Sequence, residues 1–193
     1  MRHFGFCGAV GLALAMLAAT ASGGQNATPV ANPVSSTVKG QMPRFAKNMV
    51  GAAESMPAEK FAFKPSPEMN SYGNLVLHIA ETNNFLCAKA SGATAPEVTL
   101  KETDAKDKLV AALKASFDFC TTALANVDDS KLSDPLTLFG NRPSSRAGAL
   151  IVLSDEWFDH YGTQAMYLRL NGILPPSAQP PATQPAAAQP PKP

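Results

Sequence analysis

Residues 145–171, SRAGALIVLSDEWFDHYGTQAMYLRLN, decide the fold class of this 193-residue chain. Apolar side chains recur here every three or four residues, which is the spacing of one face of an α-helix. Ser144 or Ser145 can cap the start, and Gly172 with the following proline pair can end it. The stretch therefore predicts a helix over residues 145–171. Its inward-facing residues are Leu150, Leu153, Trp157, Gln164 and Leu168.

Three further segments repeat this spacing and predict helices over residues 36–55, 71–90 and 102–127. Ser71 is a suitable cap for the second of them, and Gly92 is a suitable stop. Pro43 should end or kink the first one locally, because proline cannot donate to the helical ladder. Useful strand-like alternation and internal repeats are both absent from the sequence. We therefore predict an all-α fold, a four-helix bundle.

The connections between these helices carry their own signals. Residues 56–70 contain three prolines and predict a loop that packs on the domain. Residues 128–144 predict a long loop, with Leu136, Leu138 and Phe139 forming a buried plug. Thr99 or Thr103 can cap the third helix.

The two ends differ in composition from the middle. Residues 1–21 have a short basic start, an apolar run and small residues at its end, which predicts a secretory signal peptide. Residues 22–35 predict a flexible spacer, residues 36–174 the helical bundle, and residues 175–193 a disordered tail rich in Pro, Ala and Gln. We expect a secreted or periplasmic protein without a stable membrane span after processing.

The charge balance excludes one class of partner. The chain has 16 basic and 15 acidic residues, and Arg2 would leave with the signal peptide. A neutral mature chain lacks the cationic face that phosphate binding needs, so no nucleic-acid partner is expected. An amphipathic outer groove would allow a homodimer, although nothing in the sequence requires one.

Two histidines remain after processing, and both fall on or near the inner face of a predicted helix. Glu156 is four residues before His160 and shares its helix face, while His78 comes from another helix. Two imidazoles and a carboxylate could bind one zinc, nickel or ferrous ion. Asp155 and Asp159 could orient the imidazoles. The alternative is that both histidines only form hydrogen bonds within the groove.

Cys87 and Cys120 are the two cysteines left in the mature chain. In an exported protein they favour a disulfide that would stabilise the fold by roughly 3–4 kcal/mol. The alternative is two buried thiols that act as small apolar side chains. Arg146 or Arg169 could attract an anionic ligand, although solvated arginines are more common.

Two strings carry a resemblance to a known family: FAFKPSPEMNSYGNLVLHIAETNNFLC (61–87) and SDEWFDHYGTQAMYLRLNGILPPSA (154–178). They resemble the DinB-like family of small four-helix proteins, and the match covers roughly residues 40–177. The resemblance implies a divalent metal held by three histidines, one on the second helix and two, four apart, on the last. His78 matches the first position and His160 the last. Glu156 stands at the remaining position, so it either replaces a histidine ligand or marks a lost site.

Two hypotheses follow. The resemblance implies a metal-binding protein, either a metal-dependent hydrolase or a thiol-dependent transferase acting on an unidentified small molecule. The alternative is a non-enzymatic envelope module with a degenerate metal site, whose proline-rich tail reaches a partner.

Overall fold

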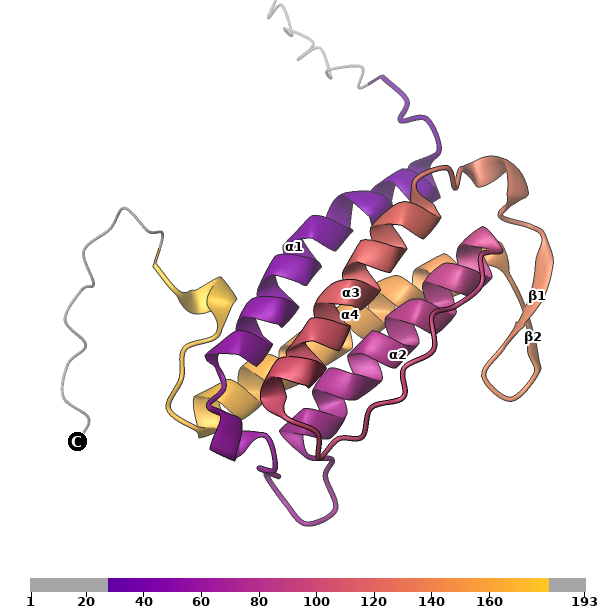
Figure 1. Cartoon of the computed structure of the whole chain (residues 1–193). Helices are drawn as coiled ribbons and strands as arrows, with labels where there is room; N and C mark the ends of the chain where they lie inside the picture. Colours follow the sequence, from indigo (N-terminus) through magenta and orange to yellow (C-terminus); the bar gives the residue numbers. More distant parts are fainter. Residues whose placement is uncertain (1–27, 181–193) are drawn as a thin grey trace, which may run out of the picture. The chain divides into compact units, whose positions relative to one another are not determined.

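In the computed structural model, which describes residues 28–180, four α-helices form a bundle (Figure 1). The predicted all-α four-helix fold is confirmed. The helices α2 and α1 each pack against both α3 and α4, so α1 and α2 lie diagonally opposite each other. The predicted signal peptide and tail residues 181–193 lie outside the described part of the chain. The helix bounds are α1, Pro33–Ser55; α2, Tyr72–Ser91; α3, Lys106–Leu124; and α4, Arg146–Leu170.

A hydrogen bond and a disulfide between α2 and α3 show that the two helices run in the same direction. The Asn83 side-chain amide donates to Ser116 Oγ, and four residues further along each helix Cys87 forms a disulfide with Cys120. The predicted disulfide is thus confirmed. Because the two helices are parallel, the chain between them must return along the bundle. It does so as an irregular strap, residues 92–105 (Figure 1).

The strap is fastened to α2 along its length. In the second half of α2, Asn84 Nδ2 donates to the Pro96 carbonyl, and at the start of the helix Ser71 Oγ donates to the Glu102 carboxylate. Gly73 is required at this crossing, because a Cβ there would lie 2.6 Å from the Glu102 carbonyl oxygen. The absence of one side chain lets two backbone segments touch.

Several predicted helix boundaries are confirmed. Ser71 Oγ accepts from Asn74 N at the start of α2, and Gly92 ends that helix with a left-handed φ of 83°. Ser145 caps α4 by accepting from Gly148 N. These caps are local, so the sequence around each one is enough to identify it.

The third helix begins four residues later than predicted, at Lys106, and neither Thr99 nor Thr103 caps it. The chain before it belongs to the strap and is fixed by contacts with α2. Pro43 does not end α1, which continues to Ser55. The missing hydrogen bond at one proline is tolerated because the helix buries an apolar face on both sides of it.

The loop expected over residues 128–144 is more regular than predicted. It contains a 3-10 turn, η2 (Asp129–Lys131), and an antiparallel hairpin of β1 (Pro135–Leu138) and β2 (Arg142–Ser145). Leu138 is buried as expected, but Phe139 is 38% exposed, so the buried plug is only partly correct. The two strands have four residues each and contain two prolines, which is too little pattern to indicate a hairpin.

The first helix starts at Pro33, within the predicted spacer. Its opening amides are capped from a distance: Asp129 accepts from Val34 N at 3.0 Å and from Ser35 N at 2.9 Å. Pro33 has no amide hydrogen and therefore needs no partner. Asp129 is far away in the sequence, so a local search for caps could not have found this start.

Replacing Asp129 with asparagine should lower the stability of the bundle at neutral pH. Desolvation opposes ionisation of this carboxyl, but the hydrogen bonds from Ser35 and Val34 outweigh it and lower its pKa below the usual 3.8. A lowered folded-state pKa stabilises the fold above pH 3.8, and that contribution is lost as the pH falls further. The difference in melting temperature between wild type and Asp129→Asn should therefore shrink below this pH. Thermal unfolding followed by circular dichroism measures it, with Asp118→Asn on exposed α3 surface as control.

Past the end of α4, the first residues of the predicted tail pack on the bundle. Residues Pro176–Ala178 form a 3-10 turn, η3, which contacts α1. The Ser177 amide donates to the Tyr161 hydroxyl of α4, and the Pro176 ring lies beside Gly51. No described helix is both long enough and apolar enough to span a bilayer.

Candidate metal centre

Three side chains with metal-binding donor atoms converge between α2 and α4; we call them the His-Glu-His cluster. His78 comes from α2, and Glu156 and His160 come from one face of α4. Donor atoms of the three residues all lie within 4.8 Å of one another. Glu156 Oε2 is 3.9 Å from His78 Nε2 and 2.6 Å from His160 Nε2. Ligands bound at about 2.0–2.2 Å lie roughly 3–4 Å apart, so this spread is close to that of a ligand set.

The state of His160 Nε2 tests whether the cluster suits a cation. The atom is shielded from solvent and has no hydrogen-bond partner among the described residues. Its 2.6 Å contact with Glu156 Oε2 lacks hydrogen-bond geometry. Two acceptor atoms this close repel unless a proton or a cation lies between them, and an unpaired buried polar atom costs about 1–3 kcal/mol. Two imidazoles and one carboxylate are also a donor set that zinc, nickel or ferrous iron accepts, so the residues fit a divalent ion.

The antiparallel packing of α2 and α4 brings the cluster together. At one end the Arg146 guanidinium donates to the Ala90 carbonyl, and at the other the Tyr167 hydroxyl donates to the Asn70 carbonyl. His78 lies between these two contacts. Its side chain is 49% exposed, so it lies at the edge of the groove rather than on the inward side that the sequence suggested.

A buried polar network fixes how α4 is rotated. Trp157, fully buried, donates from Nε1 to Asn83 Oδ1 at 2.8 Å, and the Asn83 amide donates to Ser116 Oγ at 3.0 Å. Turning Trp157 into the core leaves its neighbour Glu156 at the boundary between core and solvent. His160, one turn further, lies on the same boundary and is 14% exposed.

The two predicted supporting carboxylates behave differently. Asp159 Oδ2 lies 3.4 Å from His160 Nδ1, the nitrogen that faces away from the cluster. Asp155 is exposed, and no hydrogen bond or ion pair joins it to the cluster within the described residues. Thr82, which the sequence analysis did not select, has its hydroxyl 3.5 Å from His78 Nε2. It is four residues after His78, so the helical period alone could have identified it.

Two cavities that differ in charge meet at the cluster: Arg142 balances Glu156 in the first, and two carboxylates line the second. The first, about 520 Å³, lies between α2, α4 and the hairpin, and its lining includes His78, Glu156 and Arg142. The second, about 360 Å³, lies on the side of the loop before α2, and its lining includes Glu68 and Asp159. A hydrogen bond from Ser66 lowers the pKa of Glu68, which keeps that carboxylate ionised.

The arginine in the first cavity is not one that the sequence analysis proposed for anion binding. Arg146 is already paired with Asp134, at 3.3 Å from its Nε, and with the Ala90 carbonyl. Arg169 donates to the carbonyl of Ala165 on its own helix. Arg142 reaches the cavity only because the hairpin folds over it, and the hairpin was not predicted.

The sequence matches the family model of the DinB superfamily over residues 41–163. No curated protein matches the chain in sequence.

Solved structures with the same fold share little sequence identity with this chain. A DinB-like protein from Bacillus subtilis is 17% identical at a TM-score of 0.58, covering 70% of this chain and 92% of that one. A conserved protein from Enterococcus faecalis is 16% identical at a TM-score of 0.56, and the match covers 71% of this chain and 96% of that one. A variant of a mycothiol-dependent maleylpyruvate isomerase is 13% identical at a TM-score of 0.54, and the match covers 66% of this chain and 59% of that one. At such identities the likeness shows the fold alone.

Proposed function

The chain belongs to the DinB superfamily, and we propose that it binds one divalent metal ion through His78, Glu156 and His160. The observation that carries the proposal is the solvent-shielded His160 Nε2, which faces a carboxylate oxygen and has no hydrogen-bond partner in residues 28–180. Glu156 then acts as a ligand in place of a third histidine. A carboxylate ligand adds a negative charge that an imidazole would not supply, which strengthens the attraction for a divalent cation.

A small-molecule reaction is the role that best suits this arrangement. When bound, a zinc, nickel or ferrous ion would polarise an oxygen or activate water or a thiol. Three protein ligands leave room for a further ligand, as in catalytic rather than structural sites. The half-exposed His78 and the two cavities give a small molecule access to that position. Asp159 beside His160 Nδ1 would hold the imidazole with Nε2 free for the ion.

For the reaction class we propose a metal-dependent hydrolase or a thiol-dependent transferase. The second choice draws support from the structural likeness to an isomerase whose name states that it depends on mycothiol. We also propose that the chain is exported. The signal-like residues 1–21 and the Cys87–Cys120 disulfide support this, because disulfides persist in oxidising compartments.

Elemental analysis of untagged protein tests the metal proposal. Wild type equilibrated with zinc and then dialysed should retain about one ion per chain, as one three-ligand site requires. His160→Ala should retain almost none, because only two ligands remain. Asp159→Asn should weaken metal affinity by about 10–100-fold without abolishing it, as expected of a group that orients a ligand. Asp155→Asn, an exposed change on the same helix, is the control.

Unchanged stoichiometry in His160→Ala would overturn the proposal. The better hypothesis would then be a non-enzymatic envelope module. One observation favours that alternative and a homodimer: α4 carries four exposed apolar side chains. They are Ile151, Phe158, Met166 and Leu170.

A further inference from the structure

We propose that the cavity between the hairpin and the His-Glu-His cluster binds a small carboxylate with an apolar, flat body, and that Arg142 takes its carboxylate. This inference deepens the proposed function, because it names the substrate class for the same site. It starts from an arginine whose backbone the hairpin fixes and which has no acidic partner among the described residues.

The Arg142 guanidinium forms no ion pair among the described residues. Its Nε donates to the Phe139 carbonyl at 3.2 Å, but within the part of the chain that the structure describes no carboxylate oxygen lies within 4.0 Å of its guanidinium. The neighbouring Arg146 is instead neutralised by Asp134. A guanidinium with free N–H groups at a cavity wall suits a planar carboxylate, which it can bind through two parallel hydrogen bonds.

The hairpin holds the backbone of Arg142 in a defined position. Residues Gly140 and Asn141 both take left-handed backbone angles, with φ of 68° and 63°, and these close the turn before β2. Arg142 pairs across the hairpin with Leu138, which is buried against the bundle. The backbone of Arg142 is therefore ordered before a ligand arrives, and binding has to order only its exposed side chain.

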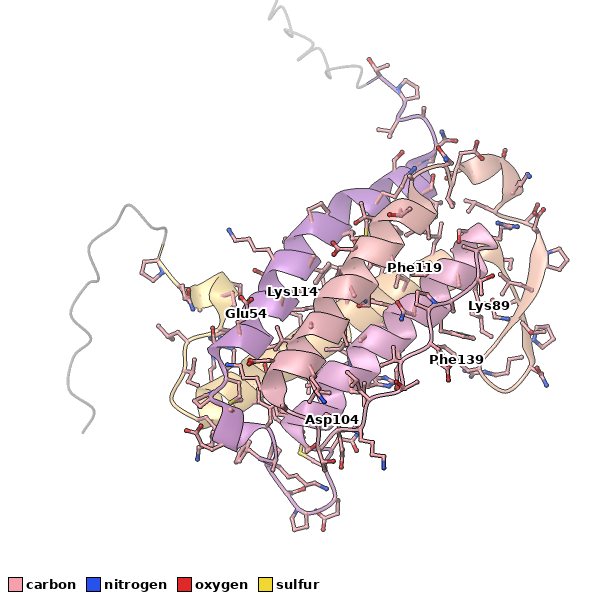
Figure 2. The ribbon with its side chains drawn as sticks, viewed as in Figure 1. Glu54, Lys89, Asp104, Lys114, Phe119 and Phe139 are labelled. Atoms are coloured by element: carbon pink, nitrogen blue, oxygen red, sulfur yellow. A yellow bond between two sulfur atoms is a disulfide. The ribbon has the colours of Figure 1, made fainter. Side chains whose placement is uncertain are left out.

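Aromatic side chains form the rim next to this arginine. Phe139 stacks on Phe85 of α2 at 5.1 Å between ring centroids, and the Arg142 guanidinium carbon lies 5.9 Å from the Phe139 ring. The ammonium of Lys89 lies 5.4 Å from the Phe85 ring and adds positive charge on the same side. Figure 2 shows Lys89 and Phe139 close together at the hairpin side of α2.

The cavity lining favours a carboxylate with an apolar body over inorganic phosphate. Leu138, Pro143 and Val152 contribute apolar wall, and the volume of about 520 Å³ falls within the range of small-molecule sites. His78 and Glu156 line the same cavity, so a bound molecule would lie next to the cluster while its carboxylate faces Arg142. The second cavity has Glu68 and Asp159 but no arginine or lysine among the described residues of its lining, so it suits the same anion less.

Binding of benzoate to the full chain tests this. Ligand-detected NMR titrations compare benzoate, its neutral isostere benzamide, and inorganic phosphate, on zinc-loaded protein and on metal-free protein. We expect benzoate to bind more tightly than the other two. Arg142→Gln should weaken benzoate by about 10–100-fold, which is the usual contribution of a charge-assisted hydrogen bond pair. The affinity of Arg142→Lys for benzoate should be intermediate, because lysine keeps the positive charge but cannot form the two parallel hydrogen bonds of a guanidinium. Arg44→Gln, an arginine stacked on Phe45 of α1, should change nothing.

The outcomes separate this inference from the metal proposal. Zinc retention with no benzoate binding, or equal benzoate affinity in wild type and Arg142→Gln, overturns the carboxylate site alone. Arg142-dependent benzoate binding to protein that retains no zinc would support the carboxylate site and leave the metal proposal refuted. Equal affinity for benzoate and benzamide would also overturn the inference. Circular dichroism of each variant checks that the bundle is folded.

Discussion

Replacing Trp157 with alanine should reduce the free energy of unfolding by about 3–5 kcal/mol, the usual cost of deleting a buried aromatic ring. Trp157 is fully buried and contacts the other three helices: Phe45 of α1 at 5.8 Å and Phe117 of α3 at 6.1 Å between ring centroids, and Asn83 of α2 through its Nε1–H. Its removal leaves a central cavity and an Asn83 oxygen without its donor. The total free energy of unfolding of a native domain is only about 5–15 kcal/mol, so the loss would be severe.

Urea denaturation of metal-free protein measures this effect without a contribution from bound ions. Trp157→Phe separates its two causes: it keeps much of the ring volume and loses the N–H, so it should cost about 1–3 kcal/mol. Phe158→Ala, next along the same helix but 52% exposed, is the matched control and should cost far less. A cost for Trp157→Ala no larger than for Phe158→Ala would show that Trp157 does not join the helices as described.

Breaking the Cys87–Cys120 disulfide should lower the free energy of unfolding by roughly 3–4 kcal/mol in the chain-entropy model. The cross-link closes a loop with a sequence separation of 33 residues, so it restricts the unfolded chain substantially. Oxidised and reduced wild type have the same side chains, and their comparison isolates the cross-link. The Cys87→Ala, Cys120→Ala variant should lose somewhat more, because both side chains are fully buried. Equal denaturation midpoints for oxidised and reduced protein would contradict the prediction.

The sequence was sufficient where the determining interactions are local. The helices α2 and α4 were predicted to within one residue at each end, because Ser71, Gly92 and Ser145 act on their own turns. Interactions between distant segments were missed. Asp129 starts α1 from a distance, and the strap, rather than a threonine cap, sets the start of α3.

The same division applies to the candidate site. Glu156 and His160 could be paired from the helical period, and pairing them with His78 needed only the expectation that two helices face each other. Arg142 could not be predicted, because its approach to the cluster depends on the hairpin fold and on the pairing with Leu138. The charge difference between the two cavities likewise emerges only when loops from separate parts of the chain meet.

The strap between α2 and α3 also determines how the protein would respond to a protease. It is a long connection without helix or strand, most of its residues are exposed, and Lys101 within it is a site for trypsin-like cleavage. The Cys87–Cys120 bond spans this segment. A chain cut there would remain a single covalent molecule, and its two fragments would separate only after reduction. This exposed connection could therefore be nicked without releasing any helix from the bundle.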